Sequence, residues 1–141
     1  MSFWRRWFTT GRRPETPAYG TDKENPVLCG GGPSGEREYL DRLRCPSGAP
    51  IRYERLGSYS TTNTAFLQRP GVSIYLGPGV SPRRAASYSD MNEVALDAYR
   101  LECECGHHRL NVFLDMYHRG PVAPIGHNGW TLVPGGMSES Q

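Results

Sequence analysis

Four cysteines and a pair of histidines are the side chains best suited to chemistry in this chain of 141 residues. The cysteines are spread over about half of its length, and the two histidines follow the last of them after one glycine. Thiolates and imidazoles are the ligands that zinc prefers, and four of them close a tetrahedral structural site. The sequence predicts such a zinc site with the ligands Cys29, Cys45, Cys103 and Cys105. His107 and His108 are possible substitutes for one of them.

The last two cysteines carry the clearest local pattern. Cys103 and Cys105 are two residues apart, so on a strand both sulfurs point to the same side. The run Cys-Glu-Cys-Gly with histidines after it resembles a zinc knuckle, although the usual zinc-ribbon spacing is Cys-x-x-Cys. Leu-Arg-Cys-Pro-Ser-Gly at 43–48 repeats the order of Leu, Cys and a glycine turn, which predicts that Cys45 faces this pair. Reduced core thiols and a disulfide are the alternatives to a metal.

Alternation of apolar and polar residues surrounds these cysteines. From Tyr99 to Cys105 every second residue is apolar, whereas Arg100, Glu102 and Glu104 fall on the opposite face. The alternation resumes after the turn at 106–108 and continues through Val112 to about residue 118. Two alternating runs joined by a short turn with glycine predict a β-hairpin over about 99–118, with its apolar face covered.

The remaining chain predicts shorter elements. Alternating segments indicate strands at 50–60 and 72–76, with a possible edge strand at 65–67. A helix is expected from Gly35 to Leu43, capped by Ser34 and ended before Pro46, because the residue before proline avoids the α region. A strand from Tyr39 to Cys45 is the alternative. The predicted fold is a small single α+β domain that is dominated by antiparallel strands and has one or two short helices.

The N-terminal residues differ in character from this domain. Four aromatic rings and two arginines crowd into six positions, and on a helix the rings would share one broad face. They are Phe3, Trp4, Arg5, Arg6, Trp7 and Phe8. We expect residues 1–26 to be a flexible docking peptide and linker, 27–134 the globular domain, and 135–141 a disordered tail. The docking peptide is predicted to bind a protein partner or a membrane surface, and folding back onto the domain is the alternative.

Composition narrows the range of partners and compartments. The net charge is only +2 and the arginines are interleaved with acids, which makes nucleic-acid binding an unlikely function. The chain has neither an apolar run long enough to span a membrane nor the apolar core of a secretory signal, so a cytoplasmic location is expected, with contact to a membrane or a larger complex possible. In that compartment cysteines more often bind metal or stay reduced than form disulfides.

These observations favour a non-enzymatic adaptor or accessory protein that folds around structural zinc. A site closed by four protein ligands leaves no position for a reactive water. The alternative is a small metal-dependent hydrolase that uses His107, His108 or His118. Asp115 and His118 are three residues apart and would point to opposite faces of a continuous strand, so no catalytic pair is expected there.

Overall fold

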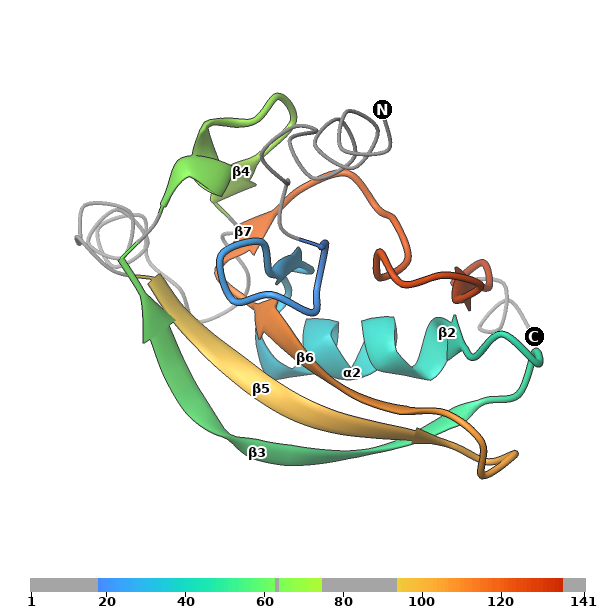
Figure 1. The fold of residues 1–141 in the computed structure, drawn as a ribbon. Helices are drawn as coiled ribbons and strands as arrows, with labels where there is room; N and C mark the ends of the chain where they lie inside the picture. The colour runs from blue at the N-terminus through green and yellow to red at the C-terminus, as the bar shows by residue number, and fades with distance from the viewer. Residues whose placement is uncertain (1–17, 63, 75–93, 136–141) are drawn as a thin grey trace, which may run out of the picture.

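In the part of the chain that the structure describes, a bent β-sheet carries an α-helix against its concave face (Figure 1). The computed structural model describes residues 18–62, 64–74 and 94–135. The predicted docking residues 3–8 lie outside these ranges, as does the tail from residue 136. Strand residues outnumber helical residues in the described part, so the coarse prediction of a small, strand-dominated α+β domain is confirmed.

A mixed four-stranded sheet forms the centre of the molecule. Its order is β1 (Val27–Leu28), β6 (Arg109–Asp115), β5 (Val94–Cys103) and β3 (Ile51–Thr61). Strand β1 runs parallel to β6, and the other neighbours are antiparallel. The predicted hairpin is present as β5 and β6, but β5 begins at residue 94 and β6 ends at residue 115. The last residue of the predicted hairpin belongs instead to β7 (His118–Arg119), which pairs with β4 (Ser73–Ile74).

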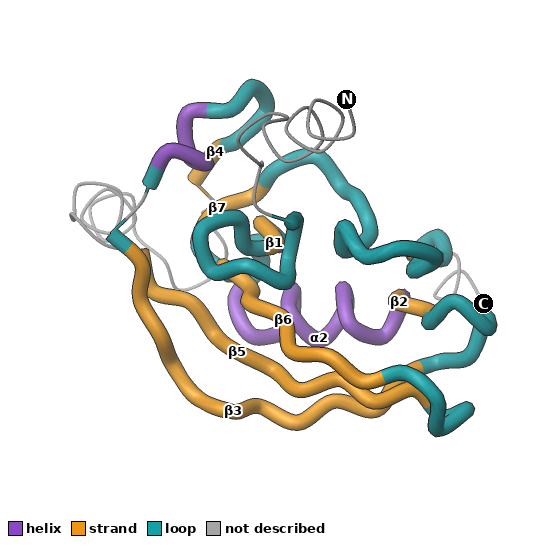
Figure 2. The backbone as a smooth tube through the Cα atoms, in the orientation of Figure 1, coloured by secondary structure: helices purple, strands orange, loops and turns teal. Residues whose placement is uncertain are grey.

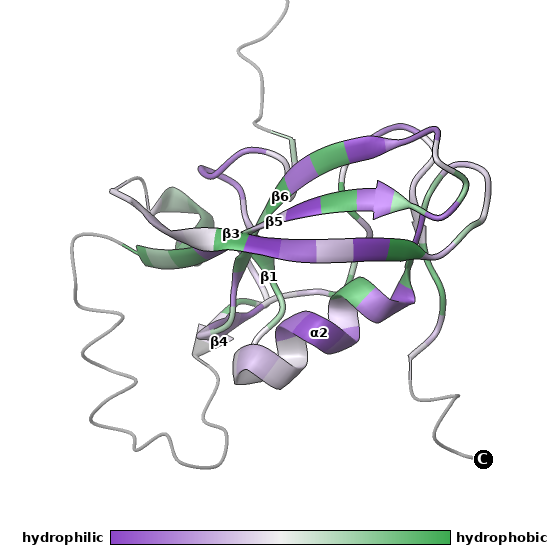
Figure 3. Cartoon of the chain, turned by 90° about the horizontal axis from the view of Figure 1, so that it is seen from below, coloured by the Kyte–Doolittle hydropathy of each residue, from purple (hydrophilic) through white to green (hydrophobic). Residues whose placement is uncertain are grey.

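Alternation in β5 separates the core from solvent as predicted. Tyr99, Leu101 and Cys103 are buried in one cluster with Tyr39 and Leu40 of the helix. The opposite face of the same part of β5 carries cross-strand ion pairs, from Arg100 to Glu54 and from Arg109 to Glu102. Figure 3 shows the apolar and polar stretches that alternate along β3, β5 and β6.

Helix α2 (Gly32–Arg42) begins three residues earlier than predicted. Its N-cap is Gly31, whose φ of 76° lies in the left-handed region that favours glycine, and Ser34 makes no capping hydrogen bond. Pro33 is accepted in the first turn, where its missing N–H breaks no helical bond. After Arg42 the chain becomes extended in β2 (Leu43–Arg44), which pairs with β8 (Thr131–Leu132).

The edge strand predicted at 65–67 is wrong, because these residues form the 3-10 helix η1 (Ala65–Gln68). Phe66, which is 1% exposed, packs with Leu28, Val94 and Leu96 in a second apolar cluster. A short helical turn lets this one large side chain enter the core without a partner strand. Of the strand predicted at 72–76, the structure describes only Ser73–Ile74 as paired.

Residues 18–26, which the sequence placed in the linker, pack against the sheet. Tyr19 contacts the main apolar cluster, and the N–H of Phe113 in β6 donates to the carbonyl of Gly20 at 2.8 Å. Asn25 and Pro26 are buried. Figure 2 shows this loop lying against β1 and β6. The packed part of the chain therefore extends upstream of Val27.

Candidate metal centre

Three cysteines and one histidine meet where the β5–β6 hairpin tip approaches the turn after β2. The ligand atoms of Cys45, Cys103, Cys105 and His108 all lie within 4.8 Å of one another. The sulfurs of Cys45 and Cys105 are 3.7 Å apart. Nδ1 of His108 lies 3.5 Å from the sulfur of Cys105 and 3.7 Å from that of Cys103.

Two turns bring these side chains together. Cys103 ends β5, and Gly106, with φ of 82°, helps to reverse the chain so that the N–H of Cys103 donates to the carbonyl of His108 at 3.0 Å. Cys45 begins the other turn, which is closed by a hydrogen bond of 2.7 Å from the N–H of Gly48 to the Cys45 carbonyl. A hydrogen bond from the N–H of Glu104 to the carbonyl of residue 50 joins the two turns.

Backbone N–H groups point at all three sulfurs. The N–H of His108 lies 3.3 Å from the sulfur of Cys103, and the N–H of His107 lies 3.5 Å from that of Cys105. Burial alone would raise the pKa of the Cys45 thiol. Hydrogen bonds from the turn at residues 47–49 have a larger effect in the opposite direction, so the pKa lies below its ordinary value. Such donors stabilise the thiolate form, which is the form that binds metal.

The spacing of the group fits a tetrahedral zinc ion. With Zn–S bonds of about 2.3 Å and Zn–N bonds of about 2.0 Å, ligand atoms should be separated by about 3.5–3.8 Å. The three separations of Cys45 from Cys105 and of His108 from Cys103 and Cys105 fall in this range. The pair of Cys103 and Cys105 differs, because their sulfurs lie at bonding distance as a disulfide. The same side chains are therefore arranged for two chemical forms.

The segment before β8 covers this group. Trp130 is buried, and its ring meets that of His108 edge to face at a centroid distance of 6.4 Å. Gly129 lies so close to Pro46 that a Cβ there would come within 2.9 Å of it. Cys45 and Cys103 are buried as well, whereas Cys105 is only partly buried. The group thus lies where three segments that are distant in the sequence meet.

Two residues of the predicted site do not belong to this group. Cys29 follows β1 beside the end of β6 that is remote from the hairpin tip, and its thiol lies 3.5 Å from the carbonyl of Asp115. Burial, followed by the nearby charges of Glu36 and Asp115, raises the pKa of this thiol well above its usual range. His107 is exposed at the tip, and its backbone N–H rather than its ring contacts the group.

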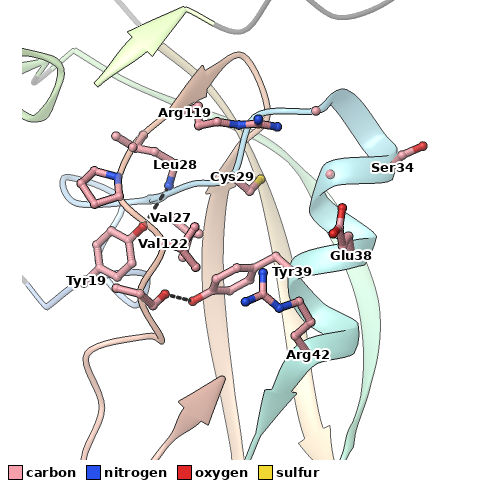
Figure 4. A pocket seen from close by; sticks show the side chains of 15 residues that line it. Tyr19, Val27, Leu28, Cys29, Ser34, Glu38, Tyr39, Arg42, Arg119 and Val122 are labelled. Carbon is pink, nitrogen blue, oxygen red and sulfur yellow. Dashed lines mark hydrogen bonds between the residues drawn. The ribbon is translucent and has the colours of Figure 1, made fainter. Parts of the chain in front are cut away.

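A pocket of about 410 Å³ opens between α2 and the segment 119–123 (Figure 4). Cys29 lies on its floor, and the hydroxyl of Tyr39 crosses it to donate to the carbonyl of Ala123 at 2.8 Å. The hydroxyl of Tyr19 accepts a hydrogen bond from the N–H of Leu28. Because the pKa of Cys29 is raised, the pocket holds a neutral thiol, which is a poor nucleophile.

Asp115 and His118 form a buried pair that the sequence did not predict. Nδ1 of His118 lies 2.8 Å from Oδ2 of Asp115, and neither side chain is more than 4% exposed. Strand β6 ends at Asp115, whose Oδ1 accepts the N–H groups of Tyr117 and His118, so the continuous strand assumed for this region is absent. Within the described residues, Nε2 of His118 is buried and has no hydrogen-bond partner.

Comparisons with family models, with curated proteins and with solved structures found no match to this chain. Across residues 18–62, 64–74 and 94–135, no helix combines the length and the apolar character that a membrane crossing requires.

Proposed function

We propose that this protein is a non-enzymatic adaptor or accessory protein whose fold is held together by a structural zinc ion. The ligands are Cys45, Cys103, Cys105 and His108. The observation that carries the proposal is the convergence of these four donor atoms within 4.8 Å of one another. Three soft thiolates with one imidazole are a donor set typical of structural zinc rather than of magnesium or calcium.

A structural role follows from the number and the placement of the ligands. Four protein ligands complete a tetrahedral shell and leave no open position for water or substrate. The four side chains come from two turns, and Trp130 from a third segment covers them. This arrangement disfavours the alternative of a metal-dependent hydrolase, because His107 is outside the group and His118 is paired with Asp115.

Docking is the second half of the proposed function, and it rests on the sequence of the N-terminal residues. Four aromatic rings in six positions are costly to leave in water, and clustered apolar surface commonly marks an interaction site. Arg5 and Arg6 between the rings suit an acidic partner surface or anionic lipid headgroups.

The metal half of the proposal is tested by metal content in two matched pairs of variants. Purified under reducing conditions, the full chain is expected to hold one zinc ion. Cys45→Ser and His108→Ala should hold substoichiometric zinc, because each removes a ligand. Cys29→Ser and His107→Ala should retain one zinc ion, because these residues lie outside the group. Elemental analysis with native mass spectrometry measures the stoichiometry. Equal zinc loss in both members of a pair would contradict the assignment.

The docking half is tested by deleting residues 1–13. The deletion should abolish binding to the partner or to vesicles and leave the thermal midpoint of the domain unchanged, because the prolines and the glycine at 14–20 predict a linker between residues 1–13 and the domain. Co-sedimentation with phosphatidylserine vesicles at low and high salt identifies a lipid target, since salt screens the attraction of arginine to anionic headgroups. Unfolding of the shortened chain would show instead that the aromatic rings belong to the core.

A further inference from the structure

Two ligands of the proposed zinc site are neighbours on one short stretch of chain. The Cα atoms of Cys103 and Cys105 are 5.2 Å apart, and the structure joins their sulfurs as a disulfide. This Cα separation lies within the range that disulfides ordinarily span. The bond therefore forms within the hairpin tip and requires no movement of β2, α2 or the covering segment.

Metal binding and this disulfide exclude each other. The thiolate is the form of cysteine that binds metal, and both thiolates are consumed when the disulfide forms. Cys45 and His108 would then be the two ligands that remain in the group. Structural zinc sites use four protein ligands, so the remaining pair cannot retain the ion in competition with solvent.

Access to the site differs among the three sulfurs. Cys45 and Cys103 are buried, whereas Cys105 is partly buried and is followed by the exposed residues Gly106 and His107. A small oxidant that arrives from solvent therefore meets Cys105 first.

We infer that the zinc site is redox-gated, so that a peroxide couples Cys103 to Cys105 and releases the metal. This inference rests on the proposed zinc site and adds its regulation. The Cys105 thiolate attacks one oxygen of hydrogen peroxide, the O–O bond breaks, and a sulfenic acid forms while hydroxide leaves. The Cys103 thiolate then attacks the sulfenic sulfur, the S–O bond breaks, and a second hydroxide leaves. Protons from solvent convert both hydroxides to water, and the peroxide gains the two electrons that the sulfurs lose.

The released site has a structural consequence at the hairpin tip. The metal holds the Cys45 turn and the tip together, and after its release the turns are linked through the backbone by the hydrogen bond from Glu104 to residue 50 and by the adjoining β3–β5 ladder, which pairs Ile51 with Cys103. The oxidised state therefore keeps the packing of Trp130 against His108 but loses the metal cross-link between the two turns. A reductant restores both thiolates, and the site can bind zinc again.

The test uses the reduced full chain loaded with zinc chloride and treated with a small excess of hydrogen peroxide. A chromogenic chelator should record release of one zinc ion per chain, with the loss of two of the four thiols. Peptide mapping should place the new bond between Cys103 and Cys105. Dithiothreitol followed by zinc chloride should restore the starting state. Cys29→Ser should behave like the wild type, because Cys29 takes no part.

A second variant separates redox gating from general sensitivity to peroxide. Cys105→His keeps four ligands in a set of two cysteines and two histidines, but it cannot form the disulfide. It should retain zinc at a peroxide excess that empties the wild-type site. Equal release from this variant, or a bond from Cys45 to Cys105 in the wild type, would overturn the inference while leaving the zinc site intact. Failure of the reduced chain to bind zinc would overturn the zinc site as well.

Discussion

Removal of the proposed zinc ion is expected to lower the free energy of unfolding of the reduced protein by at least about 5 kcal/mol, since structural zinc contributes its binding energy to folding. Zinc-finger peptides bind the ion with about 10–16 kcal/mol, which is comparable to the whole stability of an ordinary domain. The expected loss is smaller than this binding energy, because the main apolar cluster between α2 and the sheet should keep part of the protein folded without the metal. A loss of about 5 kcal/mol corresponds to a fall of about 20 °C in the thermal midpoint of a domain of this size.

Unfolding should begin in the segments around the proposed zinc site. The Cys45 turn, the hairpin tip and the segment covering them contribute few other long-range backbone bonds. Hydrogen exchange should therefore accelerate first at residues 45–50, 104–108 and 127–132 when a chelator is added. The centre of β5, which is paired on both sides, should exchange later.

The measurement is thermal unfolding followed by circular dichroism, with and without a chelator, in the presence of a thiol reductant. Added zinc should restore the midpoint. Cys29→Ser should respond to the chelator as the wild type does, whereas Cys45→Ser should already have the lower midpoint and should not respond. An unchanged midpoint after complete removal of the metal would show that the four side chains do not hold the fold together.

The sequence predicted those features that depend on local pattern. Alternation from residue 99 to 103 identified the buried face of β5, because period two is a property of the strand itself. The glycine turn after Cys105 located the hairpin tip, and the repeated Leu-x-Cys order indicated that Cys45 would face it. His108 was named only as a substitute, although a hairpin that reverses at Gly106 places it opposite Cys103.

Features that depend on distant contacts were missed. Cys29 has the right chemistry for a zinc ligand, but its parallel pairing through β1 places it at the far end of β6, and nothing near it in the sequence encodes that distance. The pair of Asp115 and His118 was excluded on the assumption of a continuous strand. The Asp115 carboxylate itself accepts the N–H groups that would otherwise extend the strand. A polar residue at the end of an alternating run was the available signal.

A buried carboxyl group makes stability depend on pH. Glu36 of α2 is 1% exposed and accepts a hydrogen bond of 2.9 Å from the hydroxyl of Tyr99. Burial and the neighbouring carboxylate of Asp97 raise the pKa of Glu36 to about 9, against the lesser opposing effects of Tyr99 and Arg55. Arg55 is bound to Asp97 at 2.6 Å and so compensates the charge of Asp97 rather than that of Glu36.

The sign of the effect follows from the protons that each state binds. Between pH 5 and 8 the folded chain keeps Glu36 protonated, whereas the unfolded chain, with an ordinary pKa near 4.5, has lost that proton. Folding then takes up a proton, so the contribution of Glu36 to stability falls as pH rises through this window. The slope approaches about 1.4 kcal/mol per pH unit, which amounts to about 4 kcal/mol between pH 5 and 8.

Glu36→Gln should remove this dependence, because the amide can still accept from Tyr99 and donate to Asp97 but does not titrate. The difference in unfolding free energy between this variant and the wild type is measured by urea denaturation at several pH values. The proposed zinc ligands are the same in both proteins, so their own pH dependence cancels in the difference. Relative to the wild type, the free energy of unfolding of the variant should increase by about 1 kcal/mol per pH unit between pH 5 and 8.

The control is Glu38→Gln, at an exposed position of the same helix, which should show the same pH dependence as the wild type. A pH-independent difference for Glu36→Gln would mean that Glu36 is already ionised in the folded protein.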